Sequence, residues 1–139
     1  MLFEHSQKLM ADAVECSRQM GININVAVFD QGGNLCAFLR MDNSPLGSVE
    51  IAQKKARSAV LFGAPTEALG QLVKNQQLDS FEQTNNGLIL FAGGEPVYQQ
   101  QRLIGGVGIS GGTAAEDKEI ALTAIRMSGL SNTRTKDES

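Results

Sequence analysis

Apolar residues recur at helical spacing from Leu2 to Met20, with polar residues between them. The repeating positions, which include one serine, are Leu2, Leu9, Met10, Ala13, Val14, Ser17 and Met20. Gly21 follows, and glycine readily ends a helix in the left-handed conformation. The spacing therefore predicts a long N-terminal helix that packs through one face.

Two strand-like runs lie on either side of a glycine-containing turn. Residues 24–29 read INVAVF and residues 35–42 read LCAFLRMD, with DQGGN between them. Glycine tolerates positive φ in such a turn, and β-branched residues favour strands. These runs predict an antiparallel hairpin.

The middle of the chain returns to helical spacing. Ser44 and Pro45 suit a helix start, and Gly63 and Pro65 suit its end. The apolar stripe of this helix consists of Val49, Ala52, Ala56, Ala59 and Val60. Charges lie beside the stripe: Lys54, Lys55 and Arg57 form a cluster that we expect to be a solvated face. Thr66 is expected to cap a shorter helix that runs to about Lys74.

The last third of the chain predicts strands and then a helix. Residues 88–112, LILFAGGEPVYQQQRLIGGVGISGG, break into three strand pieces. Thr113 and Glu116 form a T-x-x-E capping box before the apolar face of a final helix. The predicted order, α-β-β-α-α-β-β-β-α, favours an α+β domain with helices against an antiparallel sheet. We expect one domain over residues 1–130 and a polar, disordered tail over 131–139.

Composition narrows the function classes. The chain has 139 residues, 42% of them hydrophobic, a net charge of -3, no tryptophan and one tyrosine. These values give no reason to expect nucleic acid or a membrane as a partner. The N-terminal residues read as neither a signal peptide nor a membrane span, so we expect a cytoplasmic protein that keeps Cys16 and Cys36 reduced.

One glycine-rich stretch spells a dinucleotide-binding motif. Gly106, Gly108 and Gly111 give G-x-G-x-x-G. A dinucleotide site also needs a later strand with an acidic residue, and the chain ends too soon to supply it. In a strand, Gly106, Gly108 and Ser110 share one nearly bare face. That face is either the floor of a ligand site or the seat of a small-residue helix such as the alanine stripe.

The end of that stretch, SGGTAAED, runs from a strand into a helix N-terminus. Free N–H groups there, starting near Gly111, can bind an anion, whereas the capping box satisfies the same donors without a ligand. Arg40 can hold a substrate carboxylate or pair with Asp42 on the same strand. Lys54 or Asp42 can serve in proton transfer.

His5 is the only histidine. A single histidine excludes a histidine-rich zinc site within one chain, so we predict no metal site of that kind. One imidazole is enough for an axial haem ligand, while the plain alternative is a solvent-facing side chain near the terminus.

Several segments together resemble the GlcG/HbpS-like family, which includes the C-terminal domain of PduO-type proteins. They are VAVFDQGGNLCAFLRMD, SVEIAQKKARSAVLFGAPTEAL and FAGGEPVYQQQRLIGGVGISGGTAAEDKEIA. The matching positions are Asp30, Gly33, Arg40, Asp42, Lys54, Gly93, Gly94, Pro96, Gly108, Ser110, Gly111 and Asp117. The resemblance implies a three-layer α/β/α, profilin-like domain with a five-stranded antiparallel sheet, and homo-oligomers that are often octamers.

The resemblance also implies a range of functions. Family members are associated with haem binding, with glycolate or diol-utilisation operons, and in some cases with lyase chemistry. Our first hypothesis is an oligomeric accessory protein that binds haem or another tetrapyrrole. Arg40 and Lys54 would bind its carboxylates, and His5 would be its axial ligand. The cofactor-binding backbone would be that of Gly106, Gly108, Ser110 and Gly111. The second is a lyase or isomerase that acts on a small carboxylated substrate through Lys54, Asp42 and Arg40. The third is a structural oligomer without a ligand.

Overall fold

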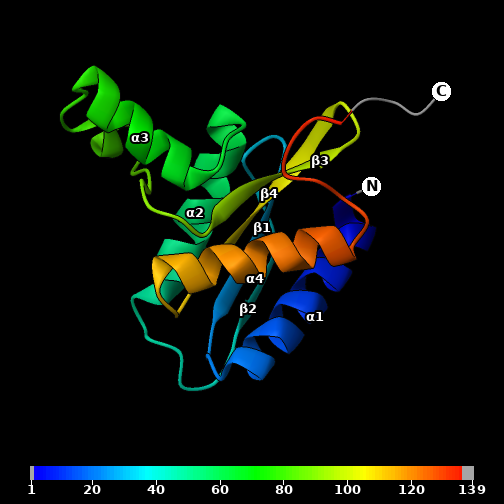
Figure 1. Ribbon diagram of the computed structural model, residues 1–139. Helices are drawn as coiled ribbons and strands as arrows, with labels where there is room; N and C mark the ends of the chain where they lie inside the picture. Colours follow the sequence, from blue (N-terminus) through cyan, green and yellow to red (C-terminus); the bar gives the residue numbers. More distant parts are fainter. Residues whose placement is uncertain (1, 136–139) are drawn as a thin grey trace.

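The computed structural model describes residues 2–135, which form four α-helices, one short 3-10 helix and four strands (Figure 1). Their order is α1 (Leu2–Met20), β1 (Asn25–Asp30), β2 (Leu35–Arg40), α2 (Ser48–Phe62), α3 (Thr66–Gln76), η1 (Phe81–Gln83), β3 (Gly94–Gln99), β4 (Arg102–Ser110) and α4 (Ala114–Met127). The predicted N-terminal helix and hairpin are confirmed, so the periodicity identified the first half of the fold correctly.

The strands form one antiparallel sheet in the order β2-β1-β4-β3. Strand β4 lies between β1 and β3, so the segment with most of the glycines is at the centre of the sheet. Because side chains alternate along a strand, β1 contributes to two cores. Val26 and Val28 join the core under α1 and α4, and Ala27 and Phe29 join the core under α2.

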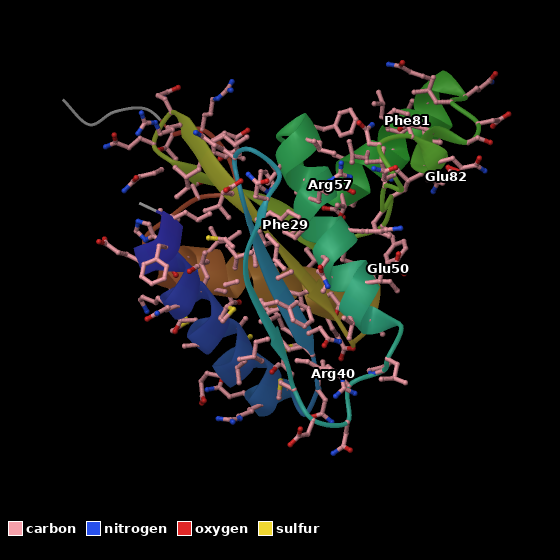
Figure 2. The ribbon with its side chains drawn as sticks, turned by 180° about the vertical axis from the view of Figure 1, so that it is seen from behind. Phe29, Arg40, Glu50, Arg57, Phe81 and Glu82 are labelled. Atoms are coloured by element: carbon pink, nitrogen blue, oxygen red, sulfur yellow. The ribbon has the colours of Figure 1, made fainter. Side chains whose placement is uncertain are left out.

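The helices and the sheet form three layers, with the sheet in the middle. Figure 1 shows α1 and α4 side by side over one face, and Figure 2, from behind, shows α2 over the opposite face. Helix α3 projects away from the sheet, and little of it is buried. Since α2 lies mainly over β4 and β1, the edge strand β2 is largely uncovered on this face.

The prediction of five strands is wrong, because the sheet has four. Residues 88–92, expected as the first of three strand pieces, pair with no strand. The amide of Leu88 donates to the carbonyl of Glu82 at 2.8 Å, and the amide of Ile89 donates to Ser58 Oγ at 3.1 Å. The segment therefore bonds through its backbone to η1 and α2, and Phe91 lies over Lys55 of α2, instead of extending the sheet.

The beginning of the expected tail contacts the sheet. Ser131 and Tyr98 exchange backbone hydrogen bonds, and the amide of Thr135 donates to the carbonyl of Gln100 at 3.0 Å. Residues 131–135 therefore run along the free edge of β3. The rest of the predicted disordered tail, residues 136–139, lies outside the described residues.

Helix ends follow the sequence signals in some places only. The capping box of Thr113 and Glu116 is confirmed, and Gly63 ends α2 in the left-handed conformation with a φ of 59°. Thr66 does not cap α3, because its hydroxyl donates to the carbonyl of Phe91 at 2.6 Å and accepts from the amide of Gly94 at 3.0 Å. Helix α2 starts at Ser48, after a turn, and not at Ser44. Within residues 2–135, no helix is both long and apolar enough to span a membrane.

Candidate functional site

A groove lies between α2 and the uncovered part of the sheet. It has a volume of about 360 Å³ and is lined by Phe29, Val49, Glu50, Gln53, Lys54, Arg57 and Asn86. Figure 2 shows Phe29 on the strand side, with Glu50 and Arg57 on α2. The helix contributes five of these side chains, so one helix face sets most of the groove's chemistry. We call this site the α2 groove.

The floor of the α2 groove is apolar. Phe29 packs in a small core with Ala27, Ala52, Ala56 and Val60, and its side chain is nearly buried. Phe38 on β2 packs against the same core and is half-buried. An aromatic floor of this kind suits the flat face of an apolar ligand.

The rim of the α2 groove is charged. Lys54 Nζ lies 2.9 Å from Glu50 Oε1, and the Lys54 side chain is 35% exposed. The hydrogen bond and charge of Lys54 hold the pKa of Glu50 below its usual value, so Glu50 is ionised at neutral pH. Arg57 donates to the carbonyl of Asn85 and retains other guanidinium N–H groups. Two cations three residues apart on one helix can bind carboxylates of one ligand.

A tight turn closes one end of the groove. Asn85, Asn86 and Gly87 all have positive φ, from 54° to 102°. A Cβ at Gly87 would lie 2.7 Å from Lys54 Nζ, so the backbone of the turn packs against that lysine. This turn supplies the groove with Asn86.

The glycines expected to form a ligand floor lie under α2. A Cβ at Gly106 would lie 2.6 Å from the carbonyl oxygen of Ala56, and one at Gly108 would lie 2.0 Å from that of Ala52. The helix backbone therefore occupies the space directly above this face. The small-residue helix, which was the alternative explanation, accounts for both glycines.

Ser110 and Gly111 stand at the end of β4 and outside the groove lining. Ser110 is 5% exposed and pairs in register with Asn25. Gly111 has a φ of 139°, and a Cβ there would lie 2.4 Å from the carbonyl oxygen of Asn23. Both residues belong to a closely packed crossing between β4 and the start of β1.

Arg40 and Asp42 line a different hollow from Lys54. This hollow, of about 420 Å³, is formed by Val14, Arg18, Asn23, Leu39, Arg40, Met41, Asp42 and Asn43. The Arg40 guanidinium donates to the carbonyl of Ser44 at 3.1 Å. Figure 2 places Arg40 at the far end of the sheet from Arg57. One chain therefore does not assemble Lys54, Arg40 and Asp42 into a single catalytic site.

His5 is on the opposite side of the sheet from the α2 groove. It is half-buried in α1, whose buried face packs on the core that contains Val26 and Val28. Because α2 packs on the other face, His5 and Lys54 of one chain do not line one cavity. Within residues 2–135, no three histidine, cysteine, aspartate or glutamate side chains gather into a metal site.

The sequence reasoning missed a buried ion pair. Lys55 Nζ donates to Asp117 Oδ2 at 3.0 Å and to the carbonyl of Ile109 at 2.7 Å, and both side chains are almost fully buried. The ring of Phe91 lies 5.1 Å from the ammonium. Burial lowers the pKa of Lys55 and raises the pKa of Asp117, while their attraction opposes both changes.

The expectation that Lys55 lies on a solvated face is wrong. The pair joins α2 to α4 and to the end of β4, and Asp117 Oδ1 also accepts from the amide of Gly112 at 2.9 Å. A signal was present in the sequence, because Lys55 occurs within the repeat of Ala52, Ala56 and Ala59. A lysine inside an alanine stripe is on the buried face of its helix.

Haem fits the α2 groove in part. The aromatic floor suits a flat macrocycle, and Lys54 and Arg57 suit its carboxylates. The described lining contains no histidine, cysteine or methionine that could ligate iron. The groove of one chain therefore offers contacts for the periphery of a tetrapyrrole and none for its metal.

Comparison with known proteins places these features in a family. A family model described as "Haem degrading protein HbpS-like" matches residues 2–126. A 15.0 kDa protein from the dhaT–dhaS intergenic region of Citrobacter freundii is 36% identical over 122 residues, which cover 85% of each chain. The corrinoid adenosyltransferase PduO of Salmonella typhimurium is 35% identical over 125 residues. Those residues are 88% of this chain but only 37% of PduO, so this chain spans little more than a third of that relative.

The fold matches a solved structure of a haem complex. The crystal structure of the PduOC:heme complex has a TM-score of 0.90 and 32% sequence identity to this chain. The match covers 95% of this chain and 97% of that one. The arrangement of four helices around the four-stranded sheet is therefore shared with a protein that was crystallised with haem.

Proposed function

This chain belongs to the HbpS-like family, and we propose that it is a small-molecule-binding protein whose α2 groove takes a planar, carboxylated ligand of the tetrapyrrole class. One observation carries this proposal: the groove combines the aromatic floor of Phe29 with two cations, Lys54 and Arg57, on its rim. The PduOC:heme complex supports the choice of ligand class, because it pairs the same fold with a planar dicarboxylate.

Four of the groove residues have a part in this proposal. Phe29 supports the flat face of the ligand, and Lys54 and Arg57 each bind a carboxylate. Glu50 pairs with Lys54 at 2.9 Å in the free protein, and a carboxylate of the ligand replaces it. The binding energy then comes from apolar burial and from charge-assisted hydrogen bonds at a half-open rim.

We propose in addition that the protein assembles as a homo-oligomer in which His5 of a second copy reaches the ligand. His5 and the groove lie on opposite faces of one chain, so only a second copy can bring them together. Apolar side chains are exposed on the loops and strand near the groove, with Leu46 at 80% and Leu35 at 50% exposure. Such side chains are typical of a surface that another chain covers.

Titration with two ligands tests the groove. Haemin is followed by its Soret band, and iron-free protoporphyrin is followed by its fluorescence. We expect the double variant K54A/R57A to bind both ligands at least tenfold more weakly, since two charge-assisted hydrogen bonds are lost. K74A/R126A is the matched control, because it removes two exposed cations outside the groove and should leave both affinities unchanged. Equal affinities for wild type and K54A/R57A would overturn the groove assignment.

Mixing variants tests the part played by a second copy. H5A has an intact groove, and K54A/R57A has an intact His5. If His5 acts across an interface, H5A alone binds haemin more weakly than wild type, and a refolded mixture of the two variants recovers part of the loss. Light scattering checks that the protein is an oligomer. If H5A binds haemin as tightly as wild type, His5 is not a ligand and only the groove proposal stands.

A further inference from the structure

The C-terminal strap, residues 131–135, closes one edge of the sheet. The amide of Tyr98 donates to the carbonyl of Ser131 at 2.7 Å, and the amide of Ser131 donates back at 3.1 Å. Gln101 Nε2 donates to the carbonyl of Thr135 at 2.6 Å. Figure 1 shows this segment as the red trace that passes from α4 to the end of β3. The strap supplies Tyr98, near the end of β3, with the hydrogen bonds that a neighbouring strand would otherwise supply.

A buried carboxylate lies under the strap. Glu95 on β3 has no exposed surface. Alternate residues of a strand share a face, so its side chain points to the same α4 face of the sheet as that of Val97. Asn132 of the strap donates from Nδ2 to Glu95 Oε1 at 2.9 Å. Among the residues that the structure describes, Glu95 Oε2 has no hydrogen-bond partner. An ionised carboxylate in this position would bury a charge with one oxygen unsatisfied.

Two charged groups face Glu95 from the neighbouring helices. Lys118 of α4 stabilises the ionised form, and Glu67 of α3 opposes it. Lys118 and Glu67 are themselves an ion pair, so much of their effect on Glu95 cancels. Burial is the largest influence and raises the pKa of Glu95 above its usual value, and the hydrogen bond from Asn132 opposes this change only in part. The closed strap therefore favours the neutral form of this side chain.

We propose that the strap is a pH-dependent latch on the β3 edge, released when the carboxylate beneath it is ionised. Opening brings water to Glu95, where the carboxylate is solvated as in a free chain. The pKa of the open state is then close to the usual value for glutamate, about 4.3. Between this value and the raised pKa of the closed state, each pH unit shifts the equilibrium toward the open strap by up to about tenfold. Below about pH 4.3 Glu95 is protonated in both states, so the closed state has its greatest stability relative to the open state.

Release of the strap exposes backbone groups at the end of β3. The N–H and C=O groups of Tyr98 and the C=O of Gln100 lose their partners at the edge of the sheet. The latch would thus control by pH the exposure of these backbone groups, independently of the ligand in the α2 groove.

Amide hydrogen exchange on the full chain tests the latch. Protection factors of Tyr98, Ser131 and Thr135, corrected for intrinsic exchange, are measured by NMR from pH 4 to pH 8. We expect them to fall with rising pH across the window above, whereas amides in the centre of β4 keep their protection. In E95Q, which cannot ionise, the strap amides should show no such fall. E119Q is the matched control, because Glu119 is an exposed carboxylate on α4 and its removal should leave the fall in place.

A second variant and a second readout keep the test decisive if E95Q does not fold. K118M removes a cation that favours ionised Glu95, so the fall in protection should continue to higher pH. Tyr98 is the only tyrosine and the chain has no tryptophan, so its fluorescence reports on the strap. The Arg134 guanidinium lies 5.6 Å from its ring, and acrylamide quenching should rise as the strap opens. Protection that is constant with pH in wild type, or that falls equally in E95Q, would overturn the latch.

Discussion

Two consecutive lysines on α2 occupy opposite environments. Lys54 is on the outer face at the rim of the α2 groove, 35% exposed, and pairs with Glu50 at 2.9 Å. Lys55 is on the inner face, 1% exposed, and pairs with Asp117 at 3.0 Å. The two ion pairs have nearly the same separation, yet only the inner pair, Lys55 and Asp117, is buried away from solvent. A charge on the outer face is therefore available to a ligand, and a charge on the inner face is committed to the fold.

The two faces also differ in how closely they approach their surroundings. On the inner face, Gly106 and Gly108 allow the α2 backbone to contact β4 directly. On the outer face, Val49, Gln53 and Arg57 stand beside a groove of about 360 Å³. Close packing on the inner face fixes the position of α2, and this position holds Lys54 and Arg57 of the outer face beside Phe29. The volume of the groove thus depends on residues that do not line it.

Breaking the inner pair should have the largest effect. D117A leaves the Lys55 ammonium buried without its carboxylate, and removal of one member of a buried pair costs about 3–5 kcal/mol. Urea unfolding followed by circular dichroism measures the loss. E119A, which removes an exposed carboxylate from the same helix, is the control and should change the free energy of unfolding little.

A double variant sharpens this result. K55M/D117L removes both charges, and a buried pair replaced by apolar residues often retains or regains stability. We expect K55M/D117L to be more stable than D117A. If D117A unfolds at the same urea concentration as wild type, the inner pair is not part of what holds α2 to α4, and the contrast between the two lysines fails.

The inner packing should have the next largest effect. In G108A the new Cβ would lie 2.0 Å from the Ala52 carbonyl oxygen and 2.6 Å from the Ala56 amide nitrogen, which are backbone atoms. Overpacking of this kind costs about 1–3 kcal/mol, and the helix must shift to relieve it. Thermal unfolding and tetrapyrrole affinity should therefore both decline.

G47A is the matched glycine control. Gly47 has a φ of -61° and no atom within 4 Å of an added Cβ, so alanine should be neutral or slightly stabilising there. A stable G108A variant that has lost only its ligand would indicate that the ligand, and not α2, lies over Gly108.

The sequence predicted the elements better than it predicted their neighbours. Helical spacing identified α1, α2 and α4, and the T-x-x-E signal identified the start of α4, because these depend on local geometry. The extra strand over residues 88–92 was wrong because strand propensity does not reveal whether a partner edge is free. The alanine repeat indicated the buried face that Lys55 shares, but its partner Asp117 is 62 positions away, and no local pattern encodes that pairing.

The candidate site was predicted in one part only. Lys54 lies in the α2 groove, but the glycines chosen with it are covered by the helix, since a bare strand face attracts a helix as readily as a ligand. Phe29 was assigned to a strand and not to a site, because its role depends on β2 being left uncovered. Arg57 was noticed as a charge, and only the fold places it beside Phe29.

The outer face should show the smallest change in stability and the clearest change in binding. K54A breaks an exposed ion pair, so its unfolding transition should be close to that of wild type. Its affinity for protoporphyrin should fall about tenfold, because one charge-assisted hydrogen bond is lost. E50Q should act in the opposite direction, since it removes the carboxylate that competes with the ligand for Lys54. Isothermal titration calorimetry of both variants measures the two effects. Equal affinities in K54A, E50Q and wild type would show that the outer lysine is as uninvolved in binding as the inner one.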